Sequence, residues 1–162
     1  MSNGFKFLVV VDDSAEFPAA LTFAALRAKA TGGGLVMLAV IEPVEAAGWA
    51  SVDAQIRLEA LANAHALTQQ FAAEAKQEAD IDAQIEVREG ETRAEIRALL
   101  DEDQGIRYVV LAAGAGAAGP GPLVSSLAKG GGLGGRPVPV VVVPGALSRE
   151  ELRALAAPLD AS

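Results

Sequence analysis

Five short apolar runs are the feature that most constrains how this 162-residue chain can fold. Each has the length of a buried strand, and helical patterns or glycine-rich stretches separate them. They cover residues 5–11, 35–41, 81–87, 108–112 and 138–143. Strands that alternate with helices need crossover connections. We therefore expect one α/β domain with an open, mostly parallel five-stranded sheet and helices on both faces.

Helix signals fill most of the segments between these runs. We expect helices over residues 14–31, with Ser14 as N-cap, and 52–79, where His65 is an ordinary surface residue. Two capping boxes, Thr92 with Glu95 and Ser148 with Glu151, predict helix starts. A short helix over residues 122–129 begins at Pro122 and is closed by Gly130. Residues 1–147 then form the α/β domain, and residues 148–162 a C-terminal helical extension.

Two of the strands carry signals of a sheet edge. Ile81, Ala83, Ile85 and Val87 alternate with polar residues, which is typical of a half-exposed strand. In the last run, from Val138 to Val143, Pro139 cannot donate a ladder hydrogen bond. Both strands are therefore predicted to lie at edges of the sheet.

Composition excludes several classes of function. There are 21 acidic and 13 basic residues, a formal charge of −8, and no basic cluster, so we expect no binding to nucleic acid or to an anionic membrane. The absence of cysteine excludes disulfides, thiolate metal sites and a cysteine nucleophile. No run approaches the roughly 20 apolar residues of a membrane span, and no signal peptide is recognisable, so the expected location is cytoplasmic.

The carboxyl ends of two strands point to a site. Asp12 follows the first strand and a glycine-rich loop follows Ala112, and in open parallel sheets ligands bind past such ends. The loop has two interpretations. Its glycines form a flexible connection, or they bring backbone amides, with Lys129, close to an anion. Asp12 likewise either contacts a ligand or hydrogen-bonds nearby backbone amides.

The order of these segments resembles the universal stress protein superfamily over residues 5–145. The family's first-strand signature is matched at Val11, Asp12, Asp13 and Ser14, and the exit of its third strand at Val87, Gly90 and Ile96. The resemblance implies an adenine-nucleotide alpha-hydrolase-like, Rossmann-like sheet in the order 3-2-1-4-5. It also implies a homodimer, here through the strand from Val138 to Val143.

The resemblance further implies ATP, with magnesium, as the ligand of nucleotide-binding members. Asp12 would face the adenine or ribose, and Val40 would pack against the base. The phosphate-binding motif of the family consists of Gly-x-x-Gly, nine further residues, and then Gly-Ser. It aligns with Ala113, Gly116, Ser126 and Leu127, of which only Gly116 agrees. Gly114 adds another glycine to the loop. Ala113 adds a methyl group where the backbone must come close, and Leu127 replaces a hydroxyl.

These departures predict weak or absent ATP binding. No hydrolase elbow, Walker lysine or histidine pair is present, so we expect no enzyme, apart from a residual ATP hydrolysis that such proteins could retain. The first expectation is a non-catalytic stress-response protein that acts as a dimeric scaffold or regulator. The alternative is an ATP-binding regulatory module, a nucleotide-responsive switch that uses the glycine-rich loop.

Overall fold

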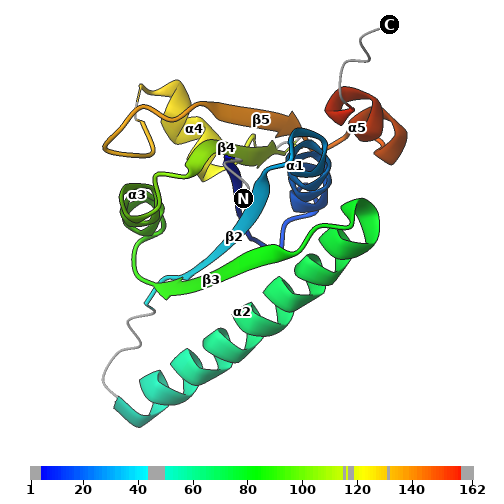
Figure 1. Cartoon of the computed structure of the whole chain (residues 1–162). Coiled ribbons are helices and arrows are strands. Elements are labelled where there is room, and N and C mark those ends of the chain that lie inside the picture. The colour runs from blue at the N-terminus through cyan, green and yellow to red at the C-terminus, as the bar shows by residue number, and fades with distance from the viewer. Residues whose placement is uncertain (1–4, 44–49, 115, 117–118, 131, 158–162) are drawn as a thin grey trace, which may run out of the picture.

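Five parallel strands form one sheet in the order β3-β2-β1-β4-β5, the order that the family resemblance implies (Figure 1). The computed structural model describes residues 5–43, 50–114, 116, 119–130 and 132–157. Trp49 and Gly131 lie outside the described residues. The strands are β1 (Lys6–Val10), β2 (Gly34–Ile41), β3 (Ala83–Glu89), β4 (Ile106–Ala113) and β5 (Val140–Pro144).

Helices cover both faces of this sheet (Figure 1). They are α1 (Phe17–Thr31), α2 (Ala50–Ala79), α3 (Thr92–Glu102), α4 (Pro122–Ala128) and α5 (Arg149–Ala156). One hydrophobic cluster joins the sheet to α1, α2 and α5, and a second joins it to α3 and α4. Strand residues alternate between the two, so Val9 belongs to the first cluster and Leu8 to the second, both fully buried. This alternation explains why the central strands are apolar throughout.

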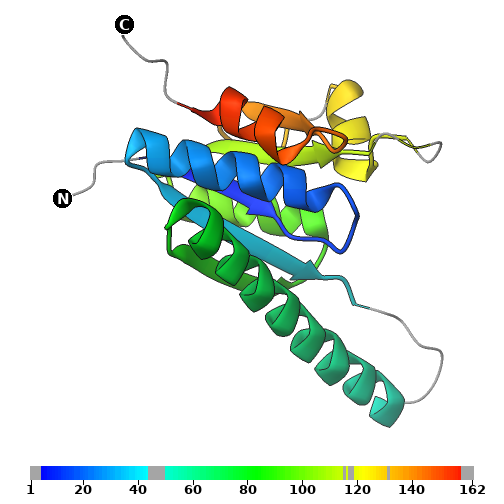
Figure 2. The same cartoon turned by 90° about the vertical axis from the view of Figure 1, so that its right-hand side faces the viewer.

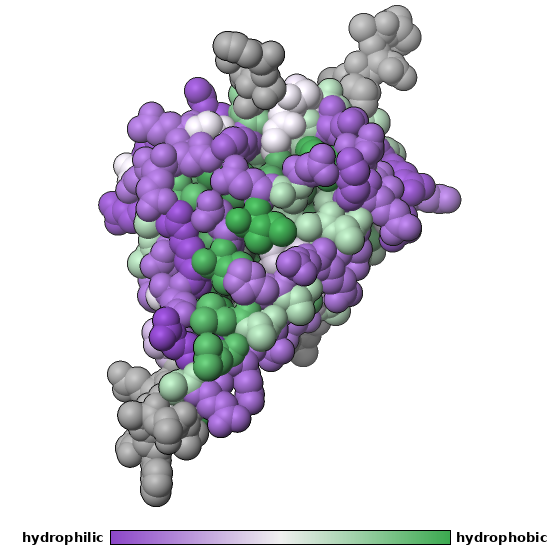
Figure 3. Space-filling model, turned by 60° about the horizontal axis from the view of Figure 1, so that its bottom comes forward, coloured by the Kyte–Doolittle hydropathy of each residue, from purple (hydrophilic) through white to green (hydrophobic). Residues whose placement is uncertain are grey.

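The helices over the first face are α1, α2 and α5 (Figure 2). Alanines at Ala20, Ala24 and Ala28 let α1 pack closely on the sheet, and Phe17 stacks edge-on against Phe71 of α2 at 4.7 Å between ring centroids. The first part of α2 extends beyond the sheet (Figures 1 and 2). Its Leu58 is 67% exposed, and a narrow hydrophobic band crosses the otherwise mostly hydrophilic surface in Figure 3.

The predicted edge positions of β3 and β5 are confirmed, with corrected bounds. Asp80 adopts a left-handed φ of 52°, which ends α2, and Ile81 then packs into the core before β3 begins at Ala83. Pro139 takes part in the sheet only through its carbonyl, which accepts from the Val109 N–H at 3.0 Å. β5 therefore begins at Val140 rather than Val138.

Two predicted helix caps are wrong, because neighbouring carboxylates compete for the capping hydroxyls. Ser14 donates to Asp12, and α1 begins later, at Phe17. Thr92 donates to Glu42 at the end of β2, and Glu91 caps α3 through both of its oxygens. The bonds from the Thr92 amide and hydroxyl hold the pKa of Glu42 below its ordinary value.

The capping box at Ser148 and Glu151 is present in full and fixes the start of α5. We expect Ser148→Ala to lower the free energy of unfolding by about 1 kcal/mol, because the Glu151 N–H loses its acceptor. The Ser148 bonds lower the pKa of Glu151, so this box stabilises the fold above the ordinary glutamate pKa and loses its effect as pH falls through the lowered value. Urea denaturation of Ser148→Ala at pH 7 checks the first expectation. Glu151→Gln checks the second, because its difference in stability from the unchanged protein should shrink between pH 7 and pH 3.

Candidate functional site

A hollow of about 280 Å³ opens where β1 and β4 end, at the place that the sequence predicts. Its walls come from the ends of both strands, the start of α1 and the first turn of α4. The lining residues are Val10, Asp12, Asp13, Ser14, Glu16, Phe17, Leu111, Ala112, Pro120, Gly121, Pro122, Leu123 and Val124. We call this cavity the switch-point hollow, because the strand order reverses between β1 and β4.

Three carboxylates and no basic side chain line the switch-point hollow. The Asp12 carboxylate accepts from the Ser14 backbone N–H at 2.9 Å and from the Ser14 hydroxyl. One of its oxygens therefore stabilises the turn after β1. Asp13 and Glu16 follow on the same turn. The hollow is therefore an acidic environment, which disfavours a phosphate group.

Glycines let Glu16 lie against the strand ends. A Cβ on Gly114 would lie 3.0 Å from Glu16 Oε1, and a Cβ on Gly145 would lie 3.0 Å from the Ala113 carbonyl oxygen and collide with the Glu16 side chain. The two glycines, which follow β4 and β5, thus make the space that Glu16 fills.

The glycine-rich loop after β4 folds back on itself. The Gly114 N–H donates to the Pro120 carbonyl at 3.3 Å, and the Gly119 N–H donates to the Gly116 carbonyl at 3.1 Å. Gly119 and Gly121 have φ values of 84° and 105°, a region that favours glycine. These glycines are thus required by the turns of the loop. Ala115, Ala117 and Ala118 lie outside the described residues.

Only some of the predicted site residues come together. Asp12 lines the switch-point hollow, and Ala113 and Gly114 follow Ala112 beside it. Gly116 is exposed, with no atom within 4 Å of the place where its Cβ would be. Three other predicted residues do not line the hollow: Val40 packs against the second core cluster, and Ser126 and Leu127 lie in the last turn of α4.

Sequence reasoning missed Glu16 and the first turn of α4. Leu127 lines a different hollow, beside Pro137 and Val140, whereas residues 121–124 line the switch-point hollow. The signal for Glu16 was its place at the start of α1, one turn after Asp12 and Asp13.

Neither a metal site nor a membrane span is found in the described part of the chain. No three or more His, Asp or Glu side chains gather there closely enough to hold a metal ion. None of its helices is long and apolar enough to cross a membrane. The switch-point hollow is therefore the strongest candidate for the site expected from the fold.

Comparison with known proteins identifies the family. The Universal stress protein family matches residues 5–130, while no curated protein matches the chain. Among solved structures, the universal stress protein UspA from Lactobacillus plantarum has a TM-score of 0.70 and 20% identity, covering 88% of this chain and 99% of its own. A universal stress protein described in complex with cAMP has a TM-score of 0.60 and 18% identity, covering 90% and 100%.

A universal stress protein from Archaeoglobus fulgidus, described in complex with dAMP, has a TM-score of 0.59 and 17% identity, covering 88% of this chain and 99% of its own. At these identities the solved structures show the fold alone. The family match covers most of the chain. This chain therefore belongs to the universal stress protein family.

Proposed function

We propose that this chain is a non-catalytic stress-response protein that acts as a dimeric scaffold or regulator and binds ATP weakly or not at all. The observation that carries the nucleotide part is the lining of the switch-point hollow, which has three carboxylates and no basic side chain. A triphosphate entering there would meet Asp12, Asp13 and Glu16 without a compensating cation. The repulsion of a unit charge at about 4 Å amounts to about 1 kcal/mol in water and more where water is excluded.

The backbone around the hollow adds few donors to offset this repulsion. Pro120 and Pro122 have no N–H, and the Gly114 and Ser125 N–H groups already donate within the loop and α4. Ser126, which the aligned motif assigns to phosphate recognition, lies at the other end of α4. Among the described residues, the Leu123 and Val124 N–H groups in the first turn of α4 have no acceptor, so a few backbone donors remain in the lining. The described lining lacks a cationic side chain and the hydroxyl of the motif.

The dimeric part of the proposal rests on β5. This edge strand pairs with β4 only, within the described residues, and its Val142 side chain is 41% exposed. An apolar edge favours pairing with a second chain. α5 packs against α1 on the first face of the sheet (Figure 2), which leaves the outer edge of β5 as the proposed interface.

The alternative function is an ATP-binding regulatory module. It is favoured by the hollow itself, which lies at the reversal of strand order, and by relatives that are described in complex with cAMP and dAMP. Magnesium accepts carboxylate oxygens, so ATP with magnesium is a different ligand from free ATP for this acidic lining. The two proposals predict different affinities for ATP: weak or absent binding for the scaffold, and micromolar binding for the regulatory module.

Calorimetric titration with ATP, with and without magnesium, separates them. We expect no micromolar binding by the unchanged protein. The double variant Asp13→Asn and Glu16→Gln should bind ATP at least about tenfold more tightly than the unchanged protein, because about 1.4 kcal/mol of repulsion corresponds to tenfold in affinity. Asp82→Asn with Glu150→Gln is the matched control, since it makes the same change in net charge at exposed positions away from the hollow.

Two results would overturn the proposal of weak binding. One is micromolar binding by the unchanged protein, or its purification with ATP already bound, which would put the regulatory module first. The other is an equal gain in affinity from the control variant, which would show that overall charge, and not the lining of the switch-point hollow, limits binding.

A further inference from the structure

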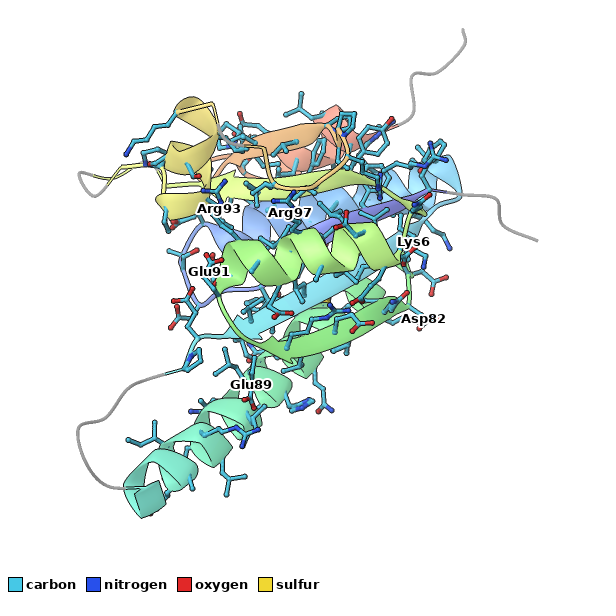
Figure 4. All side chains as sticks on the ribbon, turned by 90° about the vertical axis from the view of Figure 1, so that its left-hand side faces the viewer. Lys6, Asp82, Glu89, Glu91, Arg93 and Arg97 are labelled. Carbon is cyan, nitrogen blue, oxygen red and sulfur yellow. The ribbon has the colours of Figure 1, made fainter. Side chains whose placement is uncertain are left out.

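A second hollow lies between α3 and the loop that joins α4 to β5. It encloses about 330 Å³ and is lined by Glu91, Arg93, Ala94, Arg97, Gly132 and Leu133. None of these residues lines the switch-point hollow. We call it the arginine hollow. Figure 4 shows Arg93 and Arg97 side by side along the edge of α3 that faces α4 and this loop.

The two arginines present unused donors to this hollow. They stand one helical turn apart on α3, and both are exposed. Arg93 donates from Nη2 to the Gly132 carbonyl at 3.3 Å, which leaves the rest of its five donors available. In the part of the chain that the structure describes, no carboxylate oxygen lies within 4.0 Å of either guanidinium. In a protein with a formal charge of −8, two such arginines beside one cavity form a distinct positive site.

The acidic neighbours offset part of this charge without pairing with either guanidinium. The Glu91 carboxylate lines the hollow and keeps its negative charge, while its oxygens are held at the start of α3, where they accept from the Arg93 and Ala94 backbone N–H groups at 3.1 and 2.8 Å. Asp101 stands one turn after Arg97, and a Cβ on Gly135 would lie 3.3 Å from Asp101 Oδ1 and 3.6 Å from Arg97 Nη2. The absence of a side chain at Gly135 thus keeps the approach to Arg97 open.

The loop does not need these arginines to stay attached to α3. Leu133 is buried in the second core cluster, and Gly134 packs so closely that a Cβ there would lie 3.0 Å from Leu100 Cδ1. Arg136 reaches the end of α3 and donates to three backbone carbonyls, those of Leu100, Asp103 and Ile106. Because these contacts already fix the loop, the donors of Arg93 and Arg97 are left for another partner.

The loop also contributes backbone donors. The N–H groups of Gly132 and Leu133 have no acceptor among the described residues, and both residues line the arginine hollow. Guanidinium forks and backbone amides are the donors that bind phosphate oxygens in proteins. The cavity volume falls at the lower end of the roughly 300–1,000 Å³ of small-molecule sites, so it leaves room for a small group attached to the phosphate.

We propose that the arginine hollow binds a phosphate group through Arg93, Arg97 and the Gly132–Leu133 backbone. The ligand is a small phosphate monoester or free inorganic phosphate, and the site is independent of any nucleotide bound in the switch-point hollow. Binding there would couple the start of α3 to the loop that leads into the edge strand β5. A phosphate ligand would thus act on the element that we propose as the dimer interface.

The test is a nuclear magnetic resonance titration of the full chain at constant ionic strength. Inorganic phosphate, glycerol phosphate and chloride are the three probes, and the signals are the Arg93 and Arg97 side-chain N–H groups and the Gly132 and Leu133 amides. We expect saturable shifts with both phosphates and none with chloride. Arg93→Gln with Arg97→Gln should weaken binding at least about tenfold. Arg93→Lys with Arg97→Lys, which keeps the charge but loses the fork, should weaken it less.

A matched control removes two positive charges elsewhere, at Arg107 and Lys29, both exposed, and should leave phosphate binding unchanged. Tighter binding of glycerol phosphate than of inorganic phosphate identifies a monoester site, and the reverse identifies a site for free phosphate. The proposal is wrong if chloride produces the same shifts, if the glutamine variant keeps them, or if the control loses binding equally.

Discussion

Replacing Arg136 by alanine is expected to lower the free energy of unfolding by about 3 kcal/mol. The Arg136 guanidinium donates from Nε to the Leu100 carbonyl at 3.2 Å, and from Nη2 to the Asp103 and Ile106 carbonyls at 3.2 and 2.7 Å. The carbonyl of Leu100 belongs to the last turn of α3, where backbone acceptors lack helical partners. Hydrogen bonds from a charged donor contribute about 1.5–3 kcal/mol each, although three bonds from one group do not add in full.

Urea denaturation measures this loss as a lower midpoint with an unchanged slope. Arg136→Lys should lie between the two proteins, because an ammonium group cannot reach three carbonyls in the guanidinium geometry. Arg107→Ala, at an exposed position for which the described residues offer no hydrogen-bond partner, should change stability by less than about 0.5 kcal/mol. An Arg136→Ala protein as stable as the unchanged one would show that the loop is held by Leu133 and Gly134 alone.

Arg136 illustrates what the sequence pattern leaves out of a fold. The apolar runs and their alternation were sufficient to predict a mostly parallel sheet and both edge strands, because burial on two faces requires continuous apolar residues. The order of the strands came from the family resemblance. A lone arginine within a glycine-rich stretch has no periodicity. Its three acceptors lie between the last turn of α3 and the first residue of β4, which are distant from Arg136 in sequence. Only the folded chain brings them together.

The helix starts show a related limit. The pattern of a capping box is local, and it succeeded at Ser148, where no other group competes for the hydroxyl. It failed at Thr92, because Glu42 from the end of β2 accepts the Thr92 hydroxyl. A competing acceptor 50 residues away is invisible to a local pattern.

The sequence predicted where the candidate site lies, but it did not predict all of the residues that line it. Asp12 and the loop after β4 were predicted to meet, since parallel strands end at one edge, and both lie at the switch-point hollow. The ungapped alignment misplaced Ser126 and Leu127, because α4 begins at Pro122, as the predicted helix over residues 122–129 does, and carries them to its far end. Glu16 was missed because its approach depends on Gly145, which follows a different strand.

Replacing Val142 by lysine is expected to convert the proposed dimer into a monomer without unfolding the chain. Val142 lies in the middle of β5 and is 41% exposed, although its partner Leu111 in β4 is buried. Its side chain is therefore available to a second chain and contributes little to the monomer core. A lysine on an edge strand opposes pairing with another strand, because its charge would have to be buried beside an apolar partner.

The geometry of β5 limits how that pairing can form. The Pro139 carbonyl faces β4, so backbone groups of residues 140, 142 and 144 face the outer edge. Pro144 has no N–H, so only Val140 and Val142 can donate across a two-fold axis. With so few bonds, the side chains of the edge must supply much of the affinity. Burying one valine contributes about 1.5 kcal/mol, and it occurs twice in a symmetric interface, so its loss alone should weaken the dimer about a hundredfold.

Sedimentation velocity or light scattering at micromolar concentration distinguishes the outcomes. The unchanged protein should be a dimer and Val142→Lys a monomer with the same circular dichroism spectrum. Leu155→Lys is the matched control, because Leu155 is 61% exposed on α5, away from the edge, and its replacement should leave the dimer intact. Leu58→Lys tests the protruding part of α2 in the same way, since Leu58 is 67% exposed. A dimer that survives Val142→Lys but not Leu58→Lys would move the interface from β5 to α2, and a monomeric unchanged protein would remove the dimeric scaffold from the proposed function.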